Sequence, residues 1–190
     1  MEAGTAGPAQ GVAGPPERRL LLAAALGGAV ALALGVYGNV HDPSEDLVFT
    51  LFFSSTTAMK VYLGTVAVTF ALIQVLSATW IYGRLRIEPP EWAGYVHRIS
   101  GRLAFIVSLP VAYHCLWSLG FQDTDGRVLA HSLLGCFFYG AFAAKVVIVR
   151  SERLPGLALP IVGGLTFAVL VAAWLTSAVW FVDANGFPAL

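Results

Sequence analysis

The chain has 190 residues, of which 57% are hydrophobic and only 12% are charged, and its mean hydropathy is +0.75. A soluble domain carries about 25% charged residues, so this composition cannot supply a polar surface and predicts a protein embedded in the lipid bilayer. Eleven basic and eleven acidic residues balance to a net charge of zero, which excludes the basic excess typical of nucleic-acid-binding proteins. The two cysteines, Cys115 and Cys136, lie in apolar stretches and form no CxxC or CxxCH motif, so neither a zinc ribbon nor covalent haem is expected.

Five apolar stretches are each long enough to cross a hydrocarbon core of about 30 Å as a helix. We expect these spans at residues 20–38, 59–82, 93–119, 128–149 and 157–182. The sequence therefore predicts an all-α fold, a polytopic integral membrane helical bundle of about five transmembrane helices, with residues 18–182 as a single domain. Residues 1–17, rich in Gly, Ala and Pro, are expected to be a disordered tail, and residues 183–190 a short polar tail.

Basic and acidic residues alternate between the connections of these spans. Arginines lie before the first span and in two later connections, namely Arg18, Arg19, Arg84, Arg86, Arg150 and Arg153. The other connections carry Asp42, Glu45, Asp46, Asp123 and Asp125. Since short cytoplasmic loops are enriched in Arg and Lys, we expect a multi-pass protein of the cell membrane with a cytoplasmic N-terminus and a C-terminus outside. Two arginines before an apolar run also open a secretory signal peptide, so cleavage of the first helix is an alternative.

The first outer connection and the second span contain two further features. Residues 47–53 (LVFTLFF) are apolar but too short to span, so we expect them at the membrane interface. One face of the second span carries Lys60, Ala67, Ala71, Gln74 and Ala78. Small residues on one face allow close helix packing in lipid, and we expect Gln74 to form a hydrogen bond to another helix.

Three of the four histidines lie in apolar segments of membrane-spanning length, where ionisable side chains are costly and usually mark a functional site. His97 is expected near the cytoplasmic end of the third span, and His114 near its outer end. The 17 residues between them correspond to about 25 Å of helix, so these two side chains cannot bind one centre. His131 opens the fourth span after a short turn and is expected at the depth of His114. His41 lies in the first outer connection, on the same side of the membrane.

Small residues and a proline accompany these histidines. Gly101 and Gly135 each follow a histidine by four residues, so each shares a helix face with that imidazole and leaves room beside it. Pro110 precedes His114 by four residues and is expected to kink the third span. We interpret these positions as space for a flat macrocycle.

Residues 92–150 resemble the b-type cytochromes of the cytochrome b561 and ferric-reductase-like membrane families. The resemblance is carried by HRxxGR at 97–102, by a second histidine in PVAYHC at 110–115 and by HSLLG at 131–135. It implies haem b held between helices near the outer face, and a membrane electron carrier or redox subunit. We expect His114 and His131 to bind the iron, because only these two are both intramembrane and matched in depth.

The whole chain also resembles an uncharacterised family of small actinobacterial membrane proteins, DUF6529. The same motifs and the stretch HSxxGxxFYGAFAAK at 131–145 carry this second resemblance. It implies no established activity.

Several assignments stay open at this point. His41 could replace either histidine of the pair, and Cys115 could join His114 and His131 in a copper or zinc site. At the cytoplasmic end, His97 lies in sequence beside Arg98 and Arg102. These three residues are either an anchor for lipid phosphates or a pocket for a quinone head group or haem propionates, with His97 as proton carrier.

The alternative function is a non-redox accessory or assembly subunit whose histidines are structural. A transporter is disfavoured, because the five spans show no inverted repeat. No nucleotide-binding fingerprint is present, so flavin or nicotinamide chemistry would require another chain. The expected partners are the lipid bilayer, a quinone or a redox partner protein, and further subunits in a homo- or hetero-oligomer.

Overall fold

The structure of the protein is a computed structural model that describes residues 16–46, 48–151 and 154–190. Its elements are α1 (Pro16–Val40), α2 (Thr56–Ile81), α3 (Ala93–Tyr113), η1 (His114–Leu119), α4 (Gly126–Arg150), α5 (Ala158–Trp174), η2 (Leu175–Val179) and α6 (Trp180–Asn185). The segments η1 and η2 are π-helical turns that continue α3 and α5. The described residues contain no strand, which confirms the all-α prediction.

Five helices are long and apolar enough to cross a membrane: α1, α2, α3 with η1, α4, and α5 with η2 and α6. Their bounds agree with the predicted spans to within a few residues. Most of the expected N-terminal tail lies outside the described residues, but Pro16 and Glu17, predicted to belong to that tail, form the first turn of α1. Proline suits this position because the first turn leaves its backbone nitrogen without a hydrogen bond in any case.

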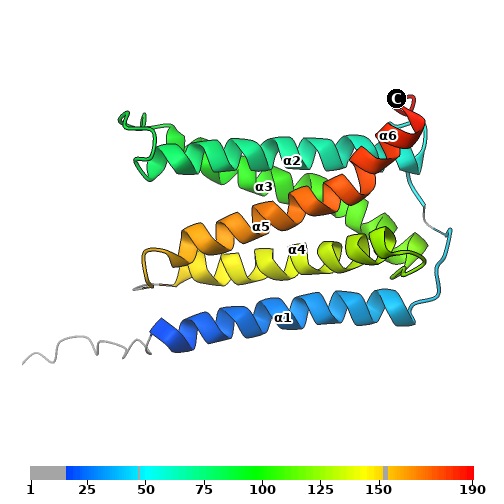
Figure 1. The fold of residues 1–190 in the computed structure, drawn as a ribbon, viewed down its shortest axis with the longest axis horizontal. Helices are drawn as coiled ribbons and strands as arrows, with labels where there is room; N and C mark the ends of the chain where they lie inside the picture. Colours follow the sequence, from blue (N-terminus) through cyan, green and yellow to red (C-terminus); the bar gives the residue numbers. More distant parts are fainter. Residues whose placement is uncertain (1–15, 47, 152–153) are drawn as a thin grey trace, which may run out of the picture.

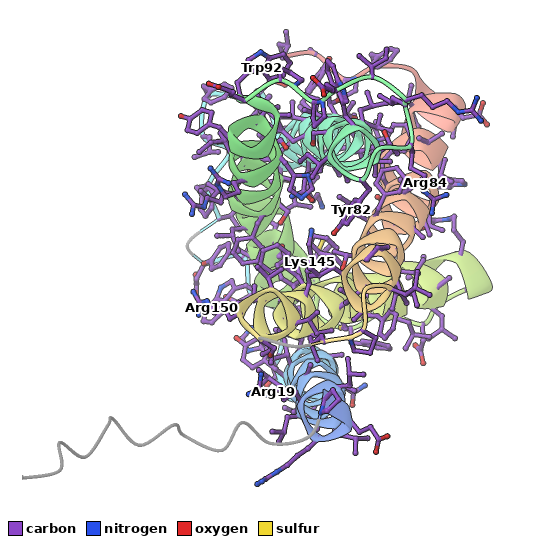
Figure 2. The ribbon with its side chains drawn as sticks, turned by 90° about the vertical axis from the view of Figure 1, so that its left-hand side faces the viewer. Arg19, Tyr82, Arg84, Trp92, Lys145 and Arg150 are labelled. Carbon is purple, nitrogen blue, oxygen red and sulfur yellow. The ribbon has the colours of Figure 1, made fainter. Side chains whose placement is uncertain are left out.

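The helices α2, α3, α4 and α5 form a ring, and α1 packs on the outside of α4 (Figures 1 and 2). Figure 2 looks onto the end of the bundle where Arg19, Arg84 and Arg150 lie, which we name the basic end. At the opposite end lie the α1–α2 and α3–α4 connections, which carry Asp42, Glu45, Asp46, Asp123 and Asp125, and we name it the acidic end. The arginine-bearing connections and the acidic connections, which alternate along the sequence, therefore lie at opposite ends of one bundle.

The buried interior is built mainly from small residues. The buried apolar side chains include Ala23, Ala58, Ala67, Ala71, Ala93, Ala104 and Ala141. Gly27 of α1 faces Gly140 of α4 so closely that a Cβ built on Gly27 would lie 2.7 Å from the Gly140 carbonyl oxygen. Helices in lipid associate mainly through such close packing, because lipid tails are as apolar as the side chains they touch.

The acidic end is tied together by hydrogen bonds. Asp125 caps α4, since its carboxylate accepts from the backbone N–H groups of Arg127 and Val128. The predicted polar C-terminal tail packs on the bundle, because the hydroxyl of Tyr62 donates to the carbonyl oxygen of Pro188 at 2.8 Å. Both contacts fix the ends of helices that border the candidate site.

The apolar segment predicted at the interface only partly lies at the surface. Leu47 is outside the described residues. Phe52 is 81% exposed, as expected for a residue at the interface, whereas Phe53 is buried against Met59. Phe49 lies against η1, where its ring contacts His114 and its carbonyl oxygen accepts a hydrogen bond. The segment therefore returns to the bundle and covers the end of the third span.

Candidate functional site

A cavity of about 430 Å³ lies inside the acidic half of the bundle. It is bordered by the start of α2, by the end of α3 with η1, by the first half of α4 and by α5 with η2. This volume is in the range of small-molecule sites, which are mostly apolar with a few polar groups. Residues of both π-helical turns line this cavity, and such turns are frequent at functional sites.

The polar side chains that line this cavity are either positively charged or neutral. Its lining includes Lys60 of α2, Arg127 and His131 of α4 and Gln122 of the α3–α4 connection, and the described lining residues include no Asp or Glu. Arg127 donates to the carbonyl oxygen of Thr176 and stacks over the ring of Trp180. The one ion pair among residues 16–46, 48–151 and 154–190 joins Arg127 to Asp125 at 3.9 Å, so Lys60 has no counter-charge there.

His131 lines the cavity in an orientation that defines its tautomer. Its Nδ1 lies 3.1 Å from the carbonyl oxygen of Ala173 and 3.3 Å from the hydroxyl oxygen of Thr176. Because a carbonyl oxygen only accepts, Nδ1 carries the hydrogen and Nε2 keeps its lone pair. Metal-binding histidines usually have this arrangement, with the second ring nitrogen bonded to a carbonyl oxygen. Gly135, one turn further along α4, also lines the cavity, and a Cβ added there would meet nothing within 4 Å.

His114 does not border this cavity. It is 2% exposed, and its Nε2 donates to the carbonyl oxygen of Phe49 at 2.6 Å. The π-helical turn begins at His114 and places the next residue, Cys115, in the cavity lining instead. The sequence predicted that His114 and His131 face one centre. In the structure, His114 contacts Phe49 of the α1–α2 connection, whereas His131 contacts Ala173 of α5.

His97 is held in the basic half of the bundle, against α2. Its Nδ1 lies 3.1 Å from the carbonyl oxygen of Gln74 and 3.0 Å from the hydroxyl oxygen of Ser77. The Gln74 side chain donates to the His97 carbonyl oxygen at 3.0 Å, so the predicted bond of Gln74 to another helix is confirmed. Arg98 and Arg102, on the same helix as His97, are exposed.

Gly101 was expected to leave room for a macrocycle, but its neighbour is the side-chain amide of Gln74. A Cβ built on Gly101 would overlap the amide of Gln74, so the missing side chain makes room for that amide against α3. The two glycines that looked equivalent in the sequence thus differ, since Gly135 opens the cavity and Gly101 permits a helix–helix hydrogen bond.

His41 belongs to the acidic-end surface. Its Nε2 lies 3.2 Å from the carbonyl oxygen of Trp117, and its ring packs between Tyr37 and Trp117. All four histidines are therefore hydrogen-bonded to a backbone carbonyl oxygen, but of the four only His131 lines the cavity.

Within the described residues, no group of three or more His, Cys, Asp or Glu side chains is arranged to hold a metal ion. The copper or zinc set of His114, Cys115 and His131 is not assembled, because His114 is bonded to Phe49 outside the cavity. Cys115 and Cys136 are both free thiols.

The sequence interpretation missed Lys60, Arg127 and Tyr139 as cavity residues. Lys60 is a cation near the start of an apolar span, a signal that would have justified treating it as a candidate. Arg127 and Tyr139 gave no comparable signal, because their position depends on how α4 turns toward its neighbours.

A model of a protein family, described as a family of unknown function (DUF6529), matches residues 20–189. The match includes the four later membrane-spanning helices in full and α1 from residue 20, and so it includes every residue that lines the cavity. Among curated proteins and among solved structures, nothing matches the chain.

Proposed function

The chain belongs to the family of unknown function DUF6529, and we propose that it is a membrane redox subunit holding haem b in the acidic half of its bundle. The observation that carries the proposal is an apolar cavity of about 430 Å³ whose lining combines His131 with Lys60 and Arg127 and, in its described part, has no carboxylate. An apolar macrocycle with two carboxylates matches that distribution of surface and charge.

The cavity residues fit haem with one protein ligand. His131 presents an unprotonated Nε2 while Ala173 orients its ring, which suits iron binding. Lys60 and Arg127 offer positive charge for propionates, and the open space beside Gly135 leaves room for a ring edge. His114 does not fit as a second ligand, because its Nε2 is already bonded to Phe49 and the side chain lies outside the cavity lining.

When bound, haem b would supply an iron that takes up and returns one electron. The residues of the chain would bind and orient the group and exclude water from it. A redox subunit also needs a partner, and a quinone or a redox protein remains the expected class. The basic end supports a membrane partner there, since Arg98 and Arg102 are exposed on α3 at that end of the bundle.

The first prediction tests this assignment directly. Protein produced with ample haem and purified in detergent is expected to show a Soret band, and His131→Ala is expected to abolish haem retention because it removes the ligand nitrogen. His41→Ala, which removes an imidazole outside the cavity, is the matched control and should keep the band. A preparation that stays colourless after haem reconstitution would reject haem as the ligand.

One specific observation favours the second candidate, a non-redox accessory or assembly subunit. Each of the four histidines bonds to a backbone carbonyl oxygen, which is sufficient to explain a buried imidazole without any ligand. A colourless protein whose melting temperature is unaffected by haem but lowered by His131→Ala would support this candidate.

The second prediction concerns orientation. We propose that the basic end faces the cytoplasm, so that the N-terminus is cytoplasmic and the C-terminus outside. With the native cysteines replaced by alanine, Ser44→Cys and Thr124→Cys in intact cells are expected to react with a membrane-impermeant maleimide. Ser151→Cys at the basic end is the control and should react only after lysis. The reverse pattern would invert the orientation.

A further inference from the structure

A polar cluster lies inside the basic half of the bundle, apart from the cavity. The ammonium group of Lys145 on α4 donates to the side-chain oxygen of Gln74 on α2 at 2.9 Å. Gln74 in turn bonds to His97 on α3, which also lies 3.0 Å from the hydroxyl of Ser77. Three helices thus contribute hydrogen-bonding groups to one place.

Lys145 is not arranged as a surface anchor. Figure 2 shows it inside the ring of helices, seen from the basic end, and its amine points to Gln74 rather than outward. No acidic group lies within ion-pair distance of it in the described part of the chain. An interior cation without a carboxylate partner is costly in a membrane and usually lies on an ion or proton path.

The floor of the cavity is polar as well. Ser108 of α3 and Tyr139 of α4 both line the cavity, and their hydroxyl oxygens lie 2.8 Å apart. Tyr139 and Lys145 are six residues apart on α4, which corresponds to about 9 Å along the helix axis. Two or three water molecules in a row would span that distance if the interval between the cavity and the polar cluster opened.

One aromatic pair occupies the interval between them. Phe142 lies midway between Tyr139 and Lys145 on α4, and it stacks on Phe105 of α3 with ring centroids 4.3 Å apart and planes at 13°. The two rings place apolar surface between the Tyr139 hydroxyl and the Lys145 amine. Hydrophobic constrictions of this kind gate conduction by excluding water.

We propose that these groups form a proton path between the cavity and the basic end, gated by the Phe105–Phe142 pair. A proton taken up at one end is passed along hydroxyl groups and water. Lys145 releases one proton from its ammonium group and takes up the next, so that one proton leaves at the other end for each proton taken up. No bond other than O–H and N–H bonds is made or broken, and an ion moving in the membrane balances the charge. The path does not depend on what the cavity binds.

The test uses the full-length protein in proteoliposomes with a pH-sensitive dye inside, a pH difference across the membrane, and valinomycin with potassium to balance charge. The wild type is expected to leak slowly. Phe142→Ala is expected to raise proton flux by about tenfold, because water can then bridge the interval. Phe137→Ala, which removes an exposed aromatic ring from the same helix, is the matched control and should leave the flux unchanged.

Two further variants make the outcome decisive. Phe105→Ala opens the gate from the facing helix and should raise the flux in the same way, even if Phe142→Ala fails to fold. Lys145→Met added to the open variant should return the flux toward the wild-type level, because the path then lacks its amine. The proposal is overturned if folded Phe105→Ala and Phe142→Ala proteins leak no faster than wild type, if Lys145→Met leaves the raised flux unchanged, or if chloride leaks as fast as protons.

Discussion

Gly27→Leu is expected to destabilise the protein by about 3 kcal/mol or more, a fall in melting temperature of about 10 °C for a chain of this size. The reason is a backbone contact. A Cβ on Gly27 would lie 2.7 Å from the Gly140 carbonyl oxygen and 3.0 Å from the Cβ of Ala144, so a leucine there must push α1 away from α4. Thermal unfolding of the detergent-purified protein, followed by circular dichroism, measures the effect.

The neighbouring residue provides the control. Gly28 is exposed, and a Cβ added there meets nothing within 4 Å, so Gly28→Leu should leave the melting temperature close to that of wild type. Both substitutions raise helix propensity by a similar amount, so the difference between their melting temperatures measures the packing of α1 on α4. Equal melting temperatures for the two variants would show that α1 does not pack on α4 through Gly27.

The second large effect is expected from His114→Ala, which should lower the free energy of unfolding by about 2–4 kcal/mol. The substitution leaves a cavity at a position that is 2% exposed and removes the donor to the Phe49 carbonyl oxygen. The α1–α2 connection is then expected to detach from η1 and become accessible to limited proteolysis between residues 41 and 55. The melting temperature and the digestion pattern together measure this loss.

His114→Gln separates the hydrogen bond from the imidazole. A glutamine amide can donate to the Phe49 carbonyl oxygen but is a poor iron ligand, so it should restore part of the stability. In haem-loaded protein, the Soret band should persist in His114→Gln and disappear in His131→Ala. A His114→Gln protein that is stable but colourless would identify His114 as an iron ligand and contradict haem binding through His131 alone.

Local features of the sequence were sufficient to predict the five spans, their bounds and the separation of basic from acidic connections. In lipid, whether a segment becomes a spanning helix depends on its own run of apolar residues, because every backbone group is satisfied within the helix. Gln74 could also be predicted to bond across helices, since an amide inside an apolar span needs a partner from outside its own helix.

The site depended on tertiary packing. His114 and His131 looked alike in the sequence, but the π-helical turn that begins at His114 directs it to Phe49, while His131 lines the cavity. Gly101 and Gly135 also looked alike, and only the neighbouring helix makes one a contact for Gln74 and the other open space. Which way a side chain faces depends on helix rotation and on the partner helix, and neither is encoded in local hydrophobicity. The sequence by itself thus determined the number and limits of the helices, whereas the tertiary structure decided which of their polar side chains meet.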